Sequence, residues 1–269
     1  MKNATAFFGL IKTLYFIKMR TTLNSFVERL VKDISALPEE LMRINLFCKR
    51  LSALEPYNMA IVLDEIYSEE KSHVPEYKAL QMTLVNHKAI SEILGADKIK
   101  LVYLASLELG LTKVSRLLTD LPPHKSAPFG YDKEEDAKME LLTLGQRRAM
   151  SKKWNKDTLD RLLSDPDPMV ITNILNNPRI TEREILKIAS KRPNSPEILR
   201  LISIHKKWGG RYNIKKAVVQ NPYTSPRIAI GIVEFLLLQD LKEIAEDSTI
   251  HPQVRGAARN IVEKRGETE

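Results

Sequence analysis

The chain has 269 residues, of which 43% are hydrophobic and 28% are charged, and this composition excludes a disordered polymer. A formal net charge of +8 favours acidic partners over basic ones. The single cysteine, Cys48, excludes an internal disulfide framework and fits a reducing compartment, so we expect a cytoplasmic protein.

The first residues form an apolar segment with several interpretations. Ala6–Ile17 (AFFGLIKTLYFI) is interrupted by Lys12, is too short to span a bilayer and precedes no small-residue cleavage site. Four interpretations are open: an amphipathic first helix, an extension upstream of a start at Met19, a membrane-surface helix, and an export signal. We treat residues 1–20 as a separate amino-terminal segment or start-site extension, and a membrane partner is not favoured.

Residues 21–120 are predicted to be helical. Apolar side chains recur every three or four positions in six stretches, which proline or glycine separates from one another. The six stretches are Phe26–Ile34, Pro38–Leu51, Pro56–Tyr67, Tyr77–Leu94, Lys98–Leu109 and Thr112–Leu118. They form either divergent copies of a helical repeat or a bundle that caps one end of a repeat array.

The next segment, residues 121–133 (LPPHKSAPFGYDK), contains three prolines and has no apolar periodicity, which predicts a linker or an exposed loop. Two further helices are predicted at Glu134–Met150 and Lys156–Leu163. Asp167 then precedes a proline and is placed to cap the following helix. Asp165 and Asp167 are not favoured as a metal site, because hard cations take six or more oxygens and no further carboxylates are suitably spaced.

A pattern of helix, turn and helix occurs three times in the carboxy-terminal part of the chain. Val170–Ala189 (VITNILNNPRITEREILKIA) aligns with Ile214–Val233 (IKKAVVQNPYTSPRIAIGIV), which begins 44 residues later, and more loosely with Leu241–Val262. Asn177-Pro178 and Asn221-Pro222 end the first helix of the first two copies, because proline cannot donate to the preceding turn. One helix pair cannot bury its own apolar face, so such copies are expected to stack.

The helices that follow these turns have recognisable N-terminal caps. Thr181 and Glu184 have the spacing of a capping box. Ser195-Pro196 and Ser225-Pro226 place a hydroxyl at the cap and proline at the first helical position. The third copy has Ser248-Thr249 where the others have Asn-Pro, so its boundaries are less well defined.

The Asn-Pro turns, the Ser/Thr-Pro caps and the aliphatic residues four positions apart resemble the leucine-rich-repeat-variant and HEAT-like α-solenoids found in many bacterial proteins. The resemblance covers about the last hundred residues. It implies an all-α chain in which residues 134–269 form a solenoid of HEAT-like units behind a helical amino-terminal region. The leucine-rich-repeat-variant type can hold a cysteine-ligated iron–sulfur cluster, but Cys48 alone cannot, so no cofactor is expected.

Positive charge is concentrated between Arg147 and Lys216, where 17 Lys and Arg stand against 7 Asp and Glu. Equivalent positions in stacked repeats fall on one face, so recurring basic turns are expected to merge into a stripe that binds a polyanion. The candidate residues for binding a polyanion or another partner are Arg147, Arg148, Lys152, Lys153, Trp154, Lys206, Lys207, Trp208, Arg211, Tyr212, Lys215 and Lys216.

The tryptophan in HKKWGGRYN (His205–Asn213) has two interpretations. Two glycines and flanking cations favour an exposed loop in which Trp208 stacks on a base, a sugar or a partner side chain. Alternatively, Trp208 packs between helices and the lysines beside it form a solvated face.

No histidine spacing matches a zinc site, and the chain has no glycine-rich phosphate loop and no nucleophile elbow. We therefore expect no catalytic, cofactor or metal residues, and the leading hypothesis is a non-enzymatic scaffold for protein–protein interaction. The alternative is nucleic-acid binding through the basic face of residues 147–216. A minor alternative is an enzyme acting on DNA bases, by analogy with HEAT-like DNA-alkylation-repeat glycosylases, with Trp154 or Trp208 as the stacking residue.

Overall fold

The computed structural model describes residues 22–68, 71, 74–128, 130–131, 137–153 and 155–266. Throughout these ranges the regular structure is α-helical, apart from isolated turns, and no strand occurs in them. The predicted all-α class is confirmed. The amino-terminal segment of residues 1–20 and the candidate Trp154 lie outside the described residues.

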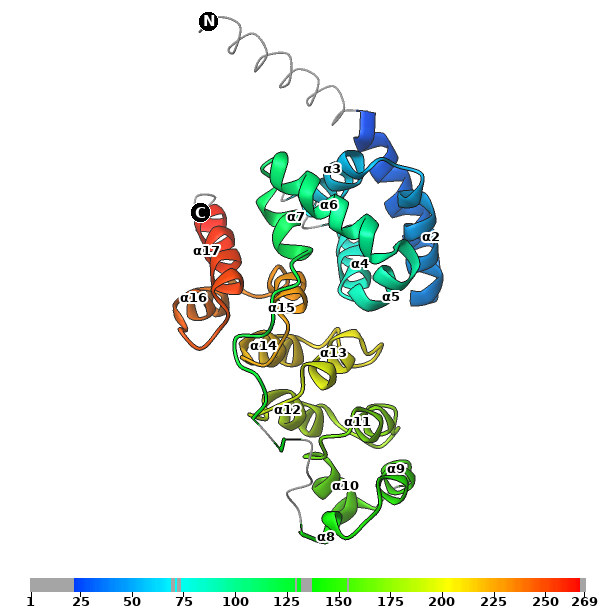
Figure 1. The fold of residues 1–269 in the computed structure, drawn as a ribbon, viewed down its shortest axis with the longest axis vertical. Helices are drawn as coiled ribbons and strands as arrows, with labels where there is room; N and C mark the ends of the chain where they lie inside the picture. The colour runs from blue at the N-terminus through cyan, green and yellow to red at the C-terminus, as the bar shows by residue number, and fades with distance from the viewer. Residues whose placement is uncertain are drawn as a thin grey trace, which may run out of the picture. The chain divides into compact units, whose positions relative to one another are not determined.

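The chain divides into two compact units, Met1–Leu118 and Thr119–Glu269. Unit 1 contains a helix over residues 22–35, followed by α2 (Glu40–Ser52), α3 (Pro56–Ile66), α4 (Pro75–Leu84), α5 (His87–Leu94), α6 (Ala96–Glu108) and α7 (Thr112–Leu117) (Figure 1). Unit 2 contains α8 (Ala137–Glu140), α9 (Leu144–Ser151), α10 (Lys156–Leu162), α11 (Pro168–Leu175), α12 (Glu182–Ser190), α13 (Pro196–Ile204), α14 (Tyr212–Gln220), α15 (Pro226–Val233), α16 (Leu238–Glu246) and α17 (Pro252–Gly266).

Two predicted helices are each divided in the structure. The predicted helix Tyr77–Leu94 is broken after α4, because the side chain of Asn86 caps a new helix by accepting from the Ala89 backbone N–H. The predicted helix Glu134–Met150 is broken before α9, because Thr143 and Gln146 form a capping box. Both single-helix predictions were wrong for the same reason: capping residues inside an apolar pattern started a second helix.

The core of unit 1 is formed where α3 packs against α6, α7 and α4, and where α2 packs against α4 and α5. Ile44 and Phe47 from α2 and Ile66 from α3 are almost fully buried. Cys48 belongs to the same core, and burial raises the pKa of its thiol to about 11. Such a thiol stays protonated at neutral pH and acts as a small apolar side chain.

In unit 2, several helices two positions apart along the chain pack against each other, as do several neighbours in sequence. The helix α11 packs between α9 and α13, α12 packs against α14, and α15 packs against α17. Figure 1 shows these helices following one another from α9 to α17. Each contact buries the apolar stripe of a short helix, which is too short to be stable alone.

The three predicted copies have turns with the same hydrogen bonds. Asn177, Asn221 and Asp247 each accept a bond at the side-chain oxygen from the backbone N–H two residues later, at 3.1, 3.1 and 2.8 Å. Each also accepts at its carbonyl oxygen from the N–H three residues later, at 3.2, 2.9 and 3.1 Å. Asp247 therefore replaces asparagine in the third copy, because a carboxylate accepts the same bond as a side-chain amide oxygen.

The first two copies begin 44 residues apart, and this interval contains three helices, whereas each copy has two. The helix α13 lies between them, and Ser195 caps it by accepting from the Glu197 backbone N–H at 3.2 Å. As a result α11 packs beside α9 and α13, whereas its counterpart α14 packs beside α12. The first helices of the two copies therefore lie in different rows of the stack.

The other predicted caps are largely as expected. Asp167 accepts from the backbone N–H groups of Met169 and Val170 at 3.1 and 3.0 Å and begins α11. The Glu184 carboxylate accepts from the Thr181 backbone N–H at 2.7 Å. At the start of α15, Pro226 occupies the first helical position as predicted, but the Ser225 hydroxyl makes no capping bond.

Helix ends in unit 2 are closed by side chains from other helices. The last carbonyls of a helix have no partner within it. The Asn221 amide donates to the carbonyls of Ala189 and Lys191, at the end of α12, at 2.8 and 3.0 Å. In return, Arg192 donates to the Gln220 carbonyl, at the end of α14, at 2.7 Å.

Lysine and arginine supply further caps of this kind in both units. The Lys191 ammonium donates to the Ser164 carbonyl in the turn after α10 at 2.6 Å, and the Arg265 guanidinium donates to the Glu234 carbonyl, at the end of α15, at 2.9 Å. Lys98 and Lys113 in unit 1 donate to the carbonyls that close α2 and α3, both at 2.6 Å. Some of the lysine and arginine side chains of the chain therefore donate hydrogen bonds within the fold.

Replacing Asn221 with alanine removes both bonds to the end of α12 and the bond that shapes its own turn. We expect Asn221→Ala to lower the free energy of unfolding of the protein by about 1–3 kcal/mol, because buried carbonyls lose their donors. Chemical denaturation followed by circular dichroism measures this loss. Asn45→Ala, at an exposed position of α2, serves as the control. Equal stability of the two variants would contradict the capping role.

Candidate basic edge of unit 2

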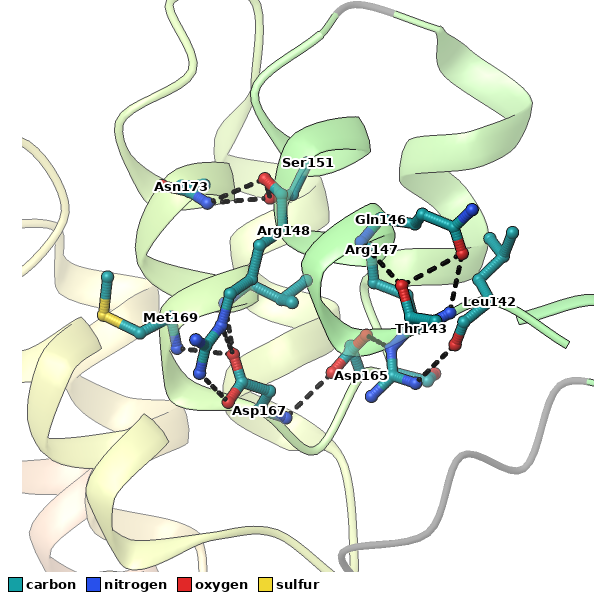
Figure 2. A network of polar contacts seen from close by, with 12 residues as sticks. Leu142, Thr143, Gln146, Arg147, Arg148, Ser151, Asp165, Asp167, Met169 and Asn173 are labelled. Carbon is teal, nitrogen blue, oxygen red and sulfur yellow. Dashed lines mark hydrogen bonds and ion pairs between the residues drawn. The ribbon is translucent and has the colours of Figure 1, made fainter. Parts of the chain in front are cut away.

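Three turns of unit 2 lie next to one another, namely those that follow α9, α11 and α13. The α9 and α11 ends are joined by Asn173, whose amide donates to the Arg148 carbonyl at 3.1 Å and to the Ser151 hydroxyl at 2.9 Å (Figure 2). The Ser151 hydroxyl itself donates to the Arg148 carbonyl at 2.8 Å. These bonds place residues 152 and 153, which follow α9, beside the end of α11.

The α11 and α13 ends are joined by the segment that was predicted as an exposed loop. The Trp208 indole N–H donates to the Leu175 carbonyl at 2.9 Å, and the His205 ring lies 3.4 Å from the Asn176 side-chain oxygen. Burial lowers the pKa of His205, and the positive charge of Lys207 lowers it further. The turn of residues 205–211 therefore lies beside the turn of residues 176–181.

The exposed charged side chains along these three turns are all positive. No Asp or Glu occurs in 152–155, 176–181 or 205–211, and the nearest carboxylates in sequence are those of Asp157 and Glu182. Six exposed cations form what we term the basic edge, Lys152, Lys153, Arg179, Lys206, Lys207 and Arg211. Five of them were predicted, and Arg179 was missed because it stands alone in sequence and joins the others only when the turns stack.

Trp208 is not an exposed stacking residue in this structure. Only 2% of its surface is exposed, the His205 ring stacks against it, and the Lys207 ammonium lies 4.2 Å from its ring centre. The turn is tight at Gly209, where an added Cβ would meet the Ser203 carbonyl oxygen at 2.2 Å. Trp208 therefore packs between helices, as the second interpretation predicted, and Gly209 allows the close approach of the turn to Ser203.

Arg147 and Arg148, two further candidates, are paired with carboxylates (Figure 2). Arg147 donates to Asp165 at 2.8 Å, and the Asp165 side chain is fully buried. Arg148 holds Asp167 with two bonds, at 3.0 and 2.9 Å. Burial raises the pKa of Asp167, but the bonds from Arg148 and from the start of α11 outweigh it, and the pKa lies below the usual range.

The candidates on α14 are also engaged with neighbouring elements. Lys216 forms ion pairs with Asp240 at 2.7 Å and with Glu243 at 3.2 Å. Tyr212 donates to the same Asp240 carboxylate. Lys215 lies over the Phe235 ring at 4.8 Å. These side chains hold α14 against the segments around α16, so the structure does not bring them to the basic edge.

Other kinds of site find no support in the described part of the chain. No group of three or more His, Cys, Asp or Glu within it is arranged to hold a metal ion. No helix there is long and apolar enough to cross a membrane. The chain matches no family model, no curated protein and no solved structure.

Arg147 and Lys153 lie close in sequence but differ in their surroundings, which gives a matched pair of variants. We expect Arg147→Met to lower the free energy of unfolding by about 3–5 kcal/mol, because Asp165 is left buried without its cation. Lys153→Met should change it by less than about 0.5 kcal/mol. Thermal or urea unfolding measures both, and adding Asp165→Asn to Arg147→Met should recover part of the loss. Similar stability of the two single variants would contradict the distinction between a cation that pairs with a buried carboxylate and an exposed cation.

Proposed function

We propose that unit 2 is an α-solenoid of HEAT-like units that binds a polyanion, nucleic acid in particular, along its basic edge. The solenoid proposal is supported by helices two positions apart packing together and by the shared turn hydrogen bonds of Asn177, Asn221 and Asp247. The single observation that carries the ligand proposal is the alignment of three turns that expose six cations and contain no carboxylate.

The geometry favours recognition of a phosphate backbone. Packed helices are about 8–10 Å apart, so three adjacent turns span roughly 20 Å, a length over which a nucleic acid presents several phosphates. Exposed lysine and arginine bind phosphates and release condensed counterions. Because Trp208 is buried, it offers no ring on which a base could stack. Contacts from lysine and arginine to phosphates position a nucleic acid but carry no sequence information, so we expect binding without sequence preference.

A structural explanation for the same charges makes a different prediction. The turns follow helix C-termini, where the helix dipole favours cations by about 0.3–1 kcal/mol each. If stabilising the helix ends were the only role of these cations, reversing their charges would lower the stability of the protein and leave ligand binding unchanged. Stability and binding are therefore measured on the same variants.

We expect labelled duplex DNA or RNA to bind the protein with an affinity that falls steeply as salt rises, by about 0.9 in the log–log slope for each phosphate neutralised on a DNA duplex. The triple variant Lys152→Glu, Lys206→Glu and Arg211→Glu should reduce that slope by about three and weaken binding. Fluorescence anisotropy at several salt concentrations measures both, and unfolding curves show whether the variant is folded.

The matched control reverses three exposed lysines of unit 1, Lys32, Lys49 and Lys78, and so makes the same change in net charge. The control should bind nearly as the wild-type protein does. A flat salt response of the wild-type protein, or equal weakening by both triple variants, would contradict binding at the basic edge.

A second candidate function is a scaffold for a protein partner, and α6 of unit 1 favours it. Leu101, Leu104 and Leu107, spaced three residues apart, are 52, 45 and 51% exposed. Exposed leucines at this spacing suit an apolar partner surface. Changing Leu101 and Leu104 to lysine should abolish capture of the partner from extract while the protein stays folded, and unchanged capture would contradict this role.

Trp208 does not fit the stacking role in action on DNA bases, and Trp154, the other candidate for that role, lies outside the described residues. That activity needs an accessible aromatic ring and a carboxylate on the basic surface. The Trp208 ring is buried, and the fully buried carboxylate of Asp165 is paired with Arg147. We therefore do not extend the proposal to an enzyme.

A further inference from the structure

A second edge of unit 2 is covered by an extended piece of the chain itself. Residues 119–128, which we term the strap, contain neither helix nor strand. In Figure 1 the strap is the green trace that leaves α7 and passes α15 and α14. The predicted linker at residues 121–133 is therefore, over its first eight residues, a segment bound to the surface of unit 2.

The first anchor of the strap is Arg227, on the first turn of α15. Its guanidinium donates to the Thr119 carbonyl at 2.8 Å and forms an ion pair with Asp120. The Arg227 side chain is 15% exposed, whereas that of Asp120 is 91% exposed. The cation is thus largely buried in unit 2, and the carboxylate that pairs with it is exposed.

The second anchor lies five residues further along the strap. The Lys125 backbone N–H donates to the Pro222 carbonyl, in the turn between α14 and α15, at 3.0 Å. Pro122 and Pro123 lie between the two anchors and have no N–H to donate, so they favour an extended backbone. Next to the second anchor, the ring of His124 meets the edge of the His251 ring at the start of α17, with 6.3 Å between ring centres.

We propose that this edge of unit 2 is a binding groove for an extended peptide with an acidic residue followed by prolines, and that the strap occupies it in cis. The groove supplies a guanidinium for the carboxylate, at Arg227, and a backbone carbonyl for the N–H five residues later, at Pro222. A partner segment with the chemistry of Asp-Leu-Pro-Pro-x-x would make the same contacts. The groove is distinct from the basic edge, which lies at the turns after α9, α11 and α13.

The strap is suited to being displaced. Most of its residues from Asp120 to Pro128 are exposed, and it contributes little to the apolar core. Segments with few buried contacts open at a small fraction of the global unfolding free energy. An identical segment in trans competes only with this local opening and not with unfolding of unit 2.

The test uses the full-length protein and a fluorescein-labelled peptide with the strap sequence TDLPPHKSAP. The double variant Asp120→Ser and Lys125→Pro removes the ion pair of the first anchor and the hydrogen bond of the second, and it leaves the residues of the groove unchanged. We expect the peptide to bind this variant at least about tenfold more tightly than the wild-type protein, the factor that corresponds to one charge-assisted hydrogen bond. Adding Arg227→Met to the double variant should abolish the gain in peptide affinity. A peptide with lysine in place of the aspartate should not bind.

Two outcomes would overturn the proposal. One is equal binding of the peptide to the wild-type protein and the double variant, and the other is binding that does not depend on Arg227. Amide hydrogen exchange on the wild-type protein tests the strap without any variant. The Lys125 amide should exchange at least about tenfold faster than that of Thr224, which bonds within the groove wall. Equal protection of the two amides would show that the strap is a fixed part of unit 2.

Discussion

The constraint on which unit 2 depends is the unpaired carbonyl group at the end of each helix. The helices between α9 and α16 are seven to nine residues long, so their unbonded end groups are a large share of their backbone. Asn173, Trp208 and Asn221 close the ends of α9, α11 and α12 from a neighbouring element. The same bonds set which turn lies beside which, and so they determine both the stack and its two edges.

This constraint divides the basic residues into two groups. Lys191, Arg192 and Arg265 donate to helix-end carbonyls, and Arg147 pairs with a buried carboxylate. Removing one of these cations leaves a buried group without a partner. The cations of the basic edge follow the helix ends and are exposed to solvent. Net charge alone does not distinguish the two groups, because both contribute equally to it.

Local signals in the sequence predicted much of the fold. Apolar periodicity gave the helical class, and Asp167 and Ser195 were recognised as caps because capping depends on neighbours in sequence. The equivalence of Asp247 to the asparagines was missed, although its bond is also local. The burial of Trp208 and the place of Arg179 on the basic edge depend on which helices stack, and that arrangement comes from contacts about 30 residues apart in sequence.

The central claim is that the exposed cations of three stacked turns, and not the cations used within the fold, contact the ligand. Lysine acetylation with and without bound duplex nucleic acid, followed by mass spectrometry, tests this claim on the unaltered protein. We expect Lys152, Lys153, Lys206 and Lys207 to lose reactivity on binding, whereas Lys242, exposed on α16, should not. Protection of Lys242 with unchanged reactivity at the basic edge would contradict it.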